Sequence, residues 1–237
     1  MLDIISSVRY STAESLTTIS IQLAPSHSPK KVKVMTDSSN KRDQLLQAAT
    51  DLFATKGFRG TSIRDIANIT STSLSNIYHY FGSKEGLVLA ILERFSREIV
   101  TELKRISELD LDPLERFELL VATHIRLAGN SMKESKIFFL DEEHLSPEGQ
   151  KVNLKIQRDI LGAYRRVLGA MNEANLVHSR KLTLTAFNIL GVVNWLLRWY
   201  RPDGSLSLEE VSQEMVSFVL NGVLVSDIKT PDLSVGS

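Results

Sequence analysis

A short stretch of the chain, residues 61–84, carries hydroxyl, aromatic and basic side chains at helical spacing. Ser62 stands three residues before Asp65, the reciprocal pattern that caps the start of a helix. Ser73 precedes a second short run, Leu74 to His79, of polar and aromatic residues. A helix start presents free N–H groups and a partial positive charge, so it can seat on a phosphate while the following side chains reach base edges. The pattern indicates a helix-turn-helix and polyanion recognition.

The elements that must position these residues are predicted to be helices throughout. One apolar face marks a first helix, formed by Leu45, Ala49, Leu52 and Phe53. Gly57 is expected to end that helix by taking a positive φ angle. Residues 70–72 form the predicted turn between the two short helices, and further helices are predicted at about 84–106, 113–127, 147–173, 180–200 and 207–223. No period-two pattern persists, so the predicted fold class is all-α.

Composition limits the functions that the chain can have. The 237 residues include no cysteine, which excludes a disulfide framework, a thiolate zinc site and a catalytic cysteine. Net charge is zero, but residues 30–105 carry 13 Lys and Arg against 8 Asp and Glu, whereas residues 106–237 carry 14 against 18. A basic front and an acidic back suit a polyanion-binding head on a body that binds something else. Chance scatter of surface charge is the alternative.

Neither a membrane span nor a signal peptide is expected. The longest uncharged stretch, 182–197, is 16 residues long and contains two asparagines, whereas a span needs roughly 20 predominantly apolar residues. Asp3 and Glu14 interrupt the N-terminal region, which lacks a continuous apolar core. We therefore expect a cytoplasmic protein without contact to a membrane.

Several motifs together resemble the TetR/AcrR family of transcriptional regulators over about residues 41–95. The motifs are Gly57-Phe58, Asp65-Ile66-Ala67, Ile77-Tyr78-His79-Tyr80-Phe81 and Ser83-Lys84-Glu85-Gly86-Leu87. Family members usually have glycine where Ser71 stands and an aliphatic residue where Thr72 stands. Ser71 is therefore expected to strain the turn, and Thr72 to weaken a core contact, without altering the DNA-reading surface.

The resemblance implies roles for nine side chains. Phosphates would be contacted by Thr61, Ser73, Asn76, Tyr78, Tyr80 and Lys84, and bases by Leu74, Ser75 and His79. Leu74 cannot hydrogen-bond, but it can contact a thymine methyl group. Packing against each other is the alternative for Leu74 and Tyr78, and an ordinary surface position is the alternative for His79. Ile77 and Phe81 are assigned to the core.

The resemblance also implies a C-terminal helical ligand-binding and dimerisation domain behind the N-terminal three-helix domain. The last two long helices would pair with their copies in a homodimer that represses from an inverted-repeat operator on double-stranded DNA until an effector releases it. Asn194-Trp195 and Trp199 to Ser207 are similar to a branch that senses acyl-coenzyme A thioesters. Gly191 and Gly222 are expected to allow close approach of helices.

The effector candidates are apolar residues for an acyl chain and arginines for phosphates. They are Arg126, Phe138, Phe139, Arg165, Arg166, Trp195 and Arg198. Two alternatives remain open. The aromatic residues can belong to the core and the arginines to solvent or ion pairs, and the effector can be an uncharged hydrophobic molecule.

These interpretations divide the chain into four parts. They are a disordered or non-native extension at 1–38, a helix-turn-helix domain at 39–83, a helical effector-binding and dimerisation domain at 84–225, and a flexible tail at 226–237. The contrary hypothesis for the first part is a basic arm, with Lys30, Lys31 and Lys33 reaching into a minor groove.

No catalytic residue, metal site or cofactor is expected. Asp141, Glu142, Glu143 and His144 form the one cluster of potential ligands, but consecutive residues on a helix point in different directions. Two rival functions remain: an architectural DNA-binding protein without an effector, and a helical enzyme that uses this cluster with His124 or His144.

Overall fold

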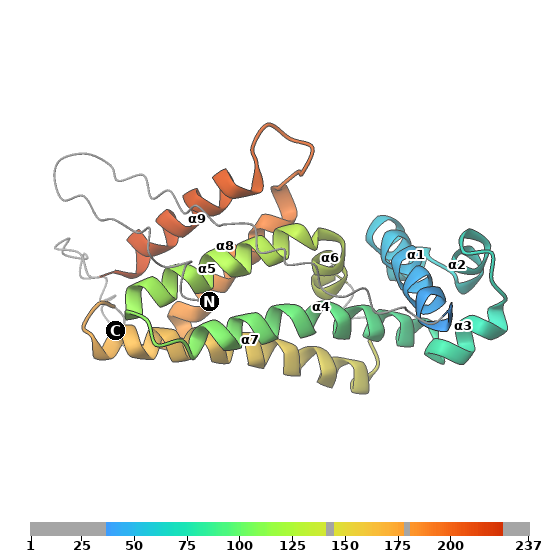
Figure 1. The fold of residues 1–237 in the computed structure, drawn as a ribbon, viewed down its shortest axis with the longest axis horizontal. Coiled ribbons are helices and arrows are strands. Elements are labelled where there is room, and N and C mark those ends of the chain that lie inside the picture. The colour runs from blue at the N-terminus through green and yellow to red at the C-terminus, as the bar shows by residue number, and fades with distance from the viewer. Residues whose placement is uncertain (1–36, 141–144, 178–180, 225–237) are drawn as a thin grey trace, which may run out of the picture. The chain divides into compact units, whose positions relative to one another are not determined.

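The computed structural model describes residues 37–140, 145–177 and 181–224, and these ranges contain nine helices (Figure 1). The helices are α1 Asp37–Gly60, α2 Ile63–Ile69, α3 Leu74–Phe81, α4 Lys84–Ser107, α5 Pro113–Asn130, α6 Met132–Leu140, α7 Pro147–Glu173, α8 Leu182–Trp199 and α9 Leu208–Val223. In this part of the chain the extended structure is limited to one isolated antiparallel bridge between Val177 and Leu224. The all-α prediction is confirmed.

Local chemistry sets the bounds of the first three helices. Gly57 has φ 71° and ψ 173°, which interrupts the helical backbone of α1 as predicted. Ser62 Oγ accepts the Asp65 N–H at 3.1 Å, and the Asp65 carboxylate accepts the Ser62 N–H at 3.0 Å. These hydrogen bonds, with the Ser62 hydroxyl first, hold the pKa of Asp65 below its usual value. The predicted capping box is therefore present.

The turn between α2 and α3 contains the expected strain. Ser71 has φ 48°, in the left-handed region where glycine is favoured. Ser73 then caps α3, since its Oγ accepts the Asn76 N–H at 3.2 Å. Gly82, with φ 71°, ends α3, and Ser83 Oγ caps α4 by accepting the Gly86 N–H at 2.9 Å. The buried side chains of Ile77 and Phe81 hold α3 in place, as predicted for core residues.

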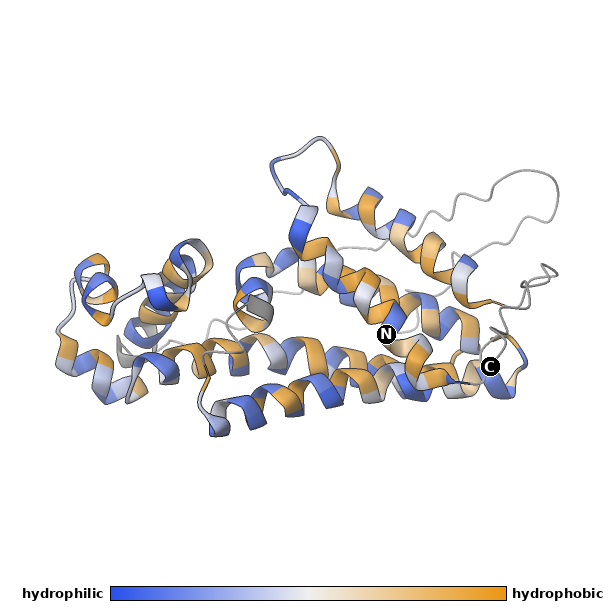
Figure 2. Cartoon of the chain, turned by 180° about the vertical axis from the view of Figure 1, so that it is seen from behind, coloured by the Kyte–Doolittle hydropathy of each residue, from blue (hydrophilic) through white to orange (hydrophobic). Residues whose placement is uncertain are grey.

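The remaining helices pack around α5 and α7. Helix α7 contacts α4, α5 and α8, and α5 also contacts α9. Figure 2 shows hydrophobic and hydrophilic residues alternating along α7, as expected for a helix with one buried face. Caps fix the starts: Asp112 before Pro113, Ser146 before Pro147, and the predicted capping box of Ser207 with Glu210. In the described part of the chain, no helix combines the length and apolar character that a membrane crossing requires.

Helix α6 was not predicted. Its last four residues, Ile137 to Leu140, are all apolar. A continuous apolar run has no one-sided helical period, so the pattern that revealed the other helices is missing. The helix matters because it brings Phe138 into the core.

Candidate nucleic-acid interface and effector pocket

Helix α3 presents an exposed surface of polar and aromatic side chains. Leu74 is 37% exposed and Tyr78 is 49% exposed, so neither is withdrawn into a core contact. The same helix and its cap expose four more of the predicted residues, Ser73, Ser75, Asn76 and His79. Tyr80 is half-buried, and its ring centroid lies 5.6 Å from that of His79. The fold thus places seven of the nine predicted residues on α3 and its cap.

Thr61 does not fit the role predicted for it. Its side chain is only 2% exposed, and its hydroxyl donates a hydrogen bond to the Gly57 carbonyl at 2.9 Å. That bond closes the turn between α1 and α2. We therefore correct the prediction: Thr61 stabilises the turn and is removed from the candidate DNA contacts.

Lys84 lies at the first residue of α4 and is half-buried. Its Nζ atom lies 4.2 Å from the centroid of the Phe58 ring, a cation–π contact. The ammonium group of Lys84 is therefore held near the start of α4, over the ring of Phe58, the residue that follows Gly57. A phosphate at this position would meet both the ammonium group and the N–H groups of the first turn.

Two contacts that sequence reasoning missed join this region to the effector helices. Glu85 Oε1 accepts the backbone N–H of Ser146, the cap of α7, at 2.8 Å. Lys133 of α6 pairs with Asp51 of α1 at 2.5 Å. Each pair is more than 60 residues apart in sequence, so no local signal could have revealed it.

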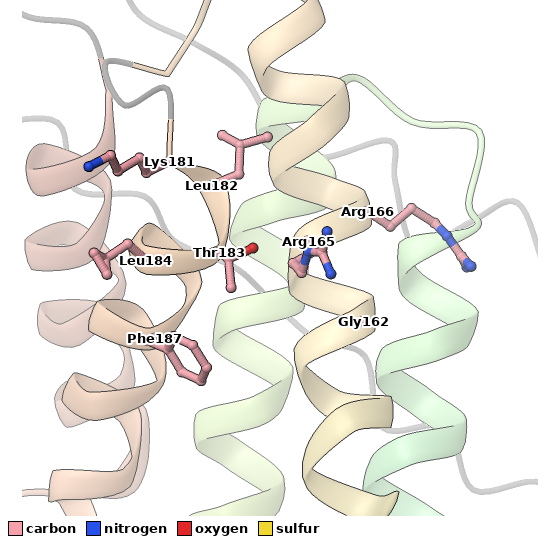
Figure 3. A pocket seen from close by; sticks show the side chains of 8 residues that line it. All are labelled: Gly162, Arg165, Arg166, Lys181, Leu182, Thr183, Leu184 and Phe187. Atoms are coloured by element: carbon pink, nitrogen blue, oxygen red, sulfur yellow. The ribbon is translucent and has the colours of Figure 1, made fainter.

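An open pocket of about 870 Å³ lies between α7 and α8 (Figure 3). Its lining combines cations with apolar side chains: Gly162, Arg165, Arg166, Lys181, Leu182, Thr183, Leu184 and Phe187. Figure 3 shows Arg166 extending away from the α8 side chains. Its Nη1 lies 2.7 Å from Glu108 Oε1 and 3.3 Å from Ser107 Oγ. Arg165 and Lys181 also line the pocket and add positive charge to it, and Lys181 was not predicted.

The other predicted effector residues do not meet at this pocket. Phe138 is 2% exposed, and its ring packs 6.2 Å from that of Phe95 in the core. Trp195 is 64% exposed, and Arg126 and Arg198 are also exposed. The side chain of Phe139 lies outside the described part of the structure. Of the seven residues predicted to line one effector site, Arg165 and Arg166 are therefore the two that line this pocket.

Helices α8 and α9 expose large apolar side chains. They are Leu184, Phe187, Trp195, Trp199 and Phe218, each at least 45% exposed. A second pocket, of about 370 Å³, lies between the two helices. At Gly191 and Gly222, a Cβ atom would meet no other atom within 4 Å, so both glycines face open space in the single chain. This apolar face is larger than isolated surface residues would produce.

His124 is buried on α5 and pairs with Tyr164 of α7. Its Nδ1 lies 2.9 Å from the hydroxyl of Tyr164, and burial lowers the pKa of His124 to about 4. Burial raises the pKa of Tyr164 in turn. The cluster at 141–144 lies outside the described residues. Among the residues that are described, no group of three His, Asp or Glu side chains is placed to hold a metal ion.

A capped recognition helix with an exposed polar face, joined to a larger helical bundle, defines a helix-turn-helix regulator. Comparison with known proteins agrees. Residues 45–91 match the model of bacterial regulatory proteins of the tetR family, and residues 110–223 match the model of the tetracyclin repressor-like C-terminal domain. The HTH-type transcriptional repressor KstR2 of Rhodococcus jostii is 30% identical over 187 residues, which cover 78% of this chain and 92% of KstR2. The chain therefore belongs to the TetR family of transcriptional regulators.

Solved structures give the same fold. The ketosteroid transcriptional regulator KstR2 of Mycobacterium tuberculosis superposes with a TM-score of 0.72 at 25% identity, covering 78% of this chain and 96% of that one. The regulator PfmR of Thermus thermophilus gives 0.70 at 26% identity, covering 75% and 97%. AibR, solved in complex with isovaleryl coenzyme A and operator DNA, gives 0.69 at 24% identity and covers 75% and 97%; at that identity the likeness is one of fold.

Proposed function

We propose that the protein is a repressor that binds an inverted-repeat operator as a homodimer and is released by an acyl-coenzyme A. One observation carries the proposal: the same chain exposes a polar reading surface on α3 and an apolar face on α8 and α9. The relatives that match over most of their length are transcriptional repressors. We accordingly treat the protein as a regulator rather than an enzyme, working in the cytoplasm, where bacterial operators are found.

The apolar face supplies the dimer contact in this proposal. Phe187 and Phe218 expose 55% and 68% of their surface, and a second copy of α8 and α9 would remove both from water. A two-fold dimer presents two α3 helices to successive major grooves, roughly 34 Å apart. Because the heads are joined through the helical bundle, an effector that favours another separation lowers operator affinity.

The pocket between α7 and α8 supports the effector class. Arg165 and Lys181 supply positive charge for phosphates, and Leu182 supplies apolar surface for the adjoining chain. Leu184 and Phe187 border both this pocket and the proposed dimer contact. AibR was solved with such a thioester and KstR2 is described as a ketosteroid regulator, so both bear on the expectation of a hydrophobic ligand. An uncharged hydrophobic effector would need the apolar surface but not the cations.

The operator is tested by selecting bound DNA from a random pool. We expect an inverted repeat whose half-sites are about one helical turn apart. Recovery of single half-sites would contradict the dimeric reading geometry. Recovery without any preferred sequence would instead favour an architectural DNA-binding protein.

The effector is tested by titrating the operator-bound protein with a fatty acid, its coenzyme A thioester and coenzyme A alone. The proposal requires release by the thioester only. Arg165→Ala should raise the concentration needed for release, because it removes a phosphate partner. Arg158→Ala is the matched control, since that arginine is exposed on the same helix and does not line the pocket. Equal release by the free acid would remove the role assigned to Arg165.

A further inference from the structure

Asn153 is a buried polar side chain without a partner. It has no exposed surface, and neither its Nδ2 nor its Oδ1 has a hydrogen bond. Among the side chains that the structure describes, it is the one whose donor and acceptor are both buried and unpaired. An unmade hydrogen bond of this kind costs about 1–3 kcal/mol, and protein interiors rarely leave such groups unpaired. We therefore expect the side-chain amide of Asn153 to have a polar partner.

The position of Asn153 follows from its neighbours on the inner face of α7. Gly149, one turn earlier, packs so closely on α4 that a Cβ atom there would lie 2.5 Å from Glu85 Oε1 and 3.4 Å from Leu89 Cδ2. Helices α4 and α7 run in the same direction, because Glu85 bonds Ser146 near one end and Glu108 bonds Arg166 near the other. One turn beyond Gly149, Asn153 therefore faces the segment of α4 that follows Leu89.

The surroundings at this level are largely apolar. The buried residues of α4 just after Leu89 are Ile91, Leu92, Phe95 and Ser96, and the Ser96 hydroxyl donates to the Glu93 carbonyl of its own helix. Ile156 follows Asn153 on the inner face of α7. Phe138 of α6 packs against Phe95. An unpaired amide among largely apolar neighbours matches the composition of small-molecule sites, in which a few polar groups fix the orientation of a hydrophobic ligand.

We infer that Asn153 hydrogen-bonds an uncharged hydroxyl group at the buried end of the effector. The inference rests on the proposed function, since it assigns a second contact for the same ligand. A hydroxyl group both donates and accepts, so it can pair with either atom of the amide. A carboxylate is disfavoured, because the Glu85 carboxylate lies one turn away and repels it. Twelve residues of helix separate Asn153 from Arg165, about 18 Å, so the ligand is long and has polar groups at both ends.

The link to DNA binding is short. A group bound at Asn153 lies one turn from Gly149, which packs against Glu85. Glu85 is the immediate neighbour of Lys84, the candidate phosphate contact. The effector end and the operator contact are thus connected through the first turns of α4 and α7.

The test compares the wild-type protein with Asn153→Leu, which keeps the branched shape and the number of heavy atoms, with larger terminal groups, and removes both polar atoms. Asn172→Leu, at an exposed position of the same helix, is the matched control. Two probe pairs are titrated against operator-bound protein: decanoyl-coenzyme A with 10-hydroxydecanoyl-coenzyme A, and methyl decanoate with methyl 10-hydroxydecanoate. The thermal unfolding of each free protein is measured in parallel.

We expect the hydroxylated probe to release the wild type at about a tenfold lower concentration, the effect of one good hydrogen bond. Asn153→Leu should lose this preference and raise Tm by about 2–4 °C, because the unpaired amide is gone. Asn172→Leu should change neither quantity.

Two results would overturn the inference. A lower Tm in both Asn153→Leu and the smaller Asn153→Val would show that the amide is already satisfied in the free protein, for instance by a water molecule, since only the larger variant overpacks the core. An absent hydroxyl preference in both probe pairs, or one that Asn153→Leu retains, would show that the amide does not contact the ligand. Preference within the ester pair alone would support Asn153 while refuting the coenzyme A thioester as effector.

Discussion

Helices α3 and α8 both expose much of their surface, but with opposite chemistry. The exposed residues of α3 include hydroxyl, amide, phenol and imidazole groups, whereas α8 exposes Leu184, Phe187 and Trp195. The polar groups on α3 remain hydrogen-bonded to water until a polyanion replaces the water. The apolar groups on α8 gain free energy when any apolar surface covers them. The two surfaces are therefore suited to different partners, and each can be altered without touching the other.

The largest expected effect comes from placing charge on the apolar face. Phe218→Glu, alone or with Phe187→Glu, should convert the dimer to a monomer, since an unpaired carboxylate in an interface costs about 3 kcal/mol or more. Operator affinity should then fall by at least about 100-fold. Val152→Glu, at an exposed apolar position of α7, is the control. Sedimentation measures the mass and DNA titration the affinity; a dimeric Phe218→Glu protein would refute the interface.

Acid should affect the interior of the α1 to α3 region less than the interior around α5. No ionisable residue is buried among the described side chains of α1 to α3, whereas His124 is buried on α5 with a pKa of about 4. The unfolded histidine, with a pKa near 6.5, binds a proton that the folded one does not. Stability is therefore present above pH 6.5 and is lost as pH falls towards 4.

This group should lower the free energy of unfolding by about 3 kcal/mol between pH 7 and pH 4. Urea unfolding at fixed protein concentration measures the loss. His124→Gln can still bond Tyr164 but does not titrate in this range, so its loss over the same interval should be smaller by that amount. Equal losses in both proteins would contradict the assignment.

On α3, His79→Ala should change which base is preferred at one operator position, by about 1–3 kcal/mol. His79 is exposed next to the half-buried Tyr80, so its removal leaves the core intact. Binding to a library of single-base operator variants measures the effect. An unchanged preference at every position would return His79 to the status of an ordinary surface residue.

The smallest effects are expected at the phosphate contacts. Tyr78→Phe and Lys84→Ala should weaken binding to all DNA sequences alike, because phosphates carry no sequence. Lys84→Ala should also reduce the slope of log affinity against log salt by about 0.9. That slope distinguishes a lost phosphate contact from loss of the cation–π contact with Phe58, which would lower stability without changing the counterions released.

The sequence predicted the reading region well because its determinants are local. The Ser62–Asp65 box, the Ser73 cap and the strained Ser71 turn each depend on residues within four positions. The effector-binding region depends on residues that meet only after folding. Phe138 is buried in the core by α6, a helix whose sequence has no periodic pattern. Arg166 pairs with Glu108, the residue that follows α4. Asn153 gave no signal, since a single asparagine in a helix ordinarily faces solvent.

The hydrogen bond from Ser146 to Glu85 makes one backbone amide a reporter for the whole regulatory cycle. Its hydrogen lies at the junction of α4 and α7, where the acceptor is the residue next to Lys84. If operator binding holds α4 in place, that hydrogen should exchange with solvent deuterium more slowly in the DNA complex than in the free protein. An effector that releases the operator must, by the reciprocity of coupled binding, favour the state in which it exchanges faster. One peptide from the start of α7 would then register both ligands without any label on either of them.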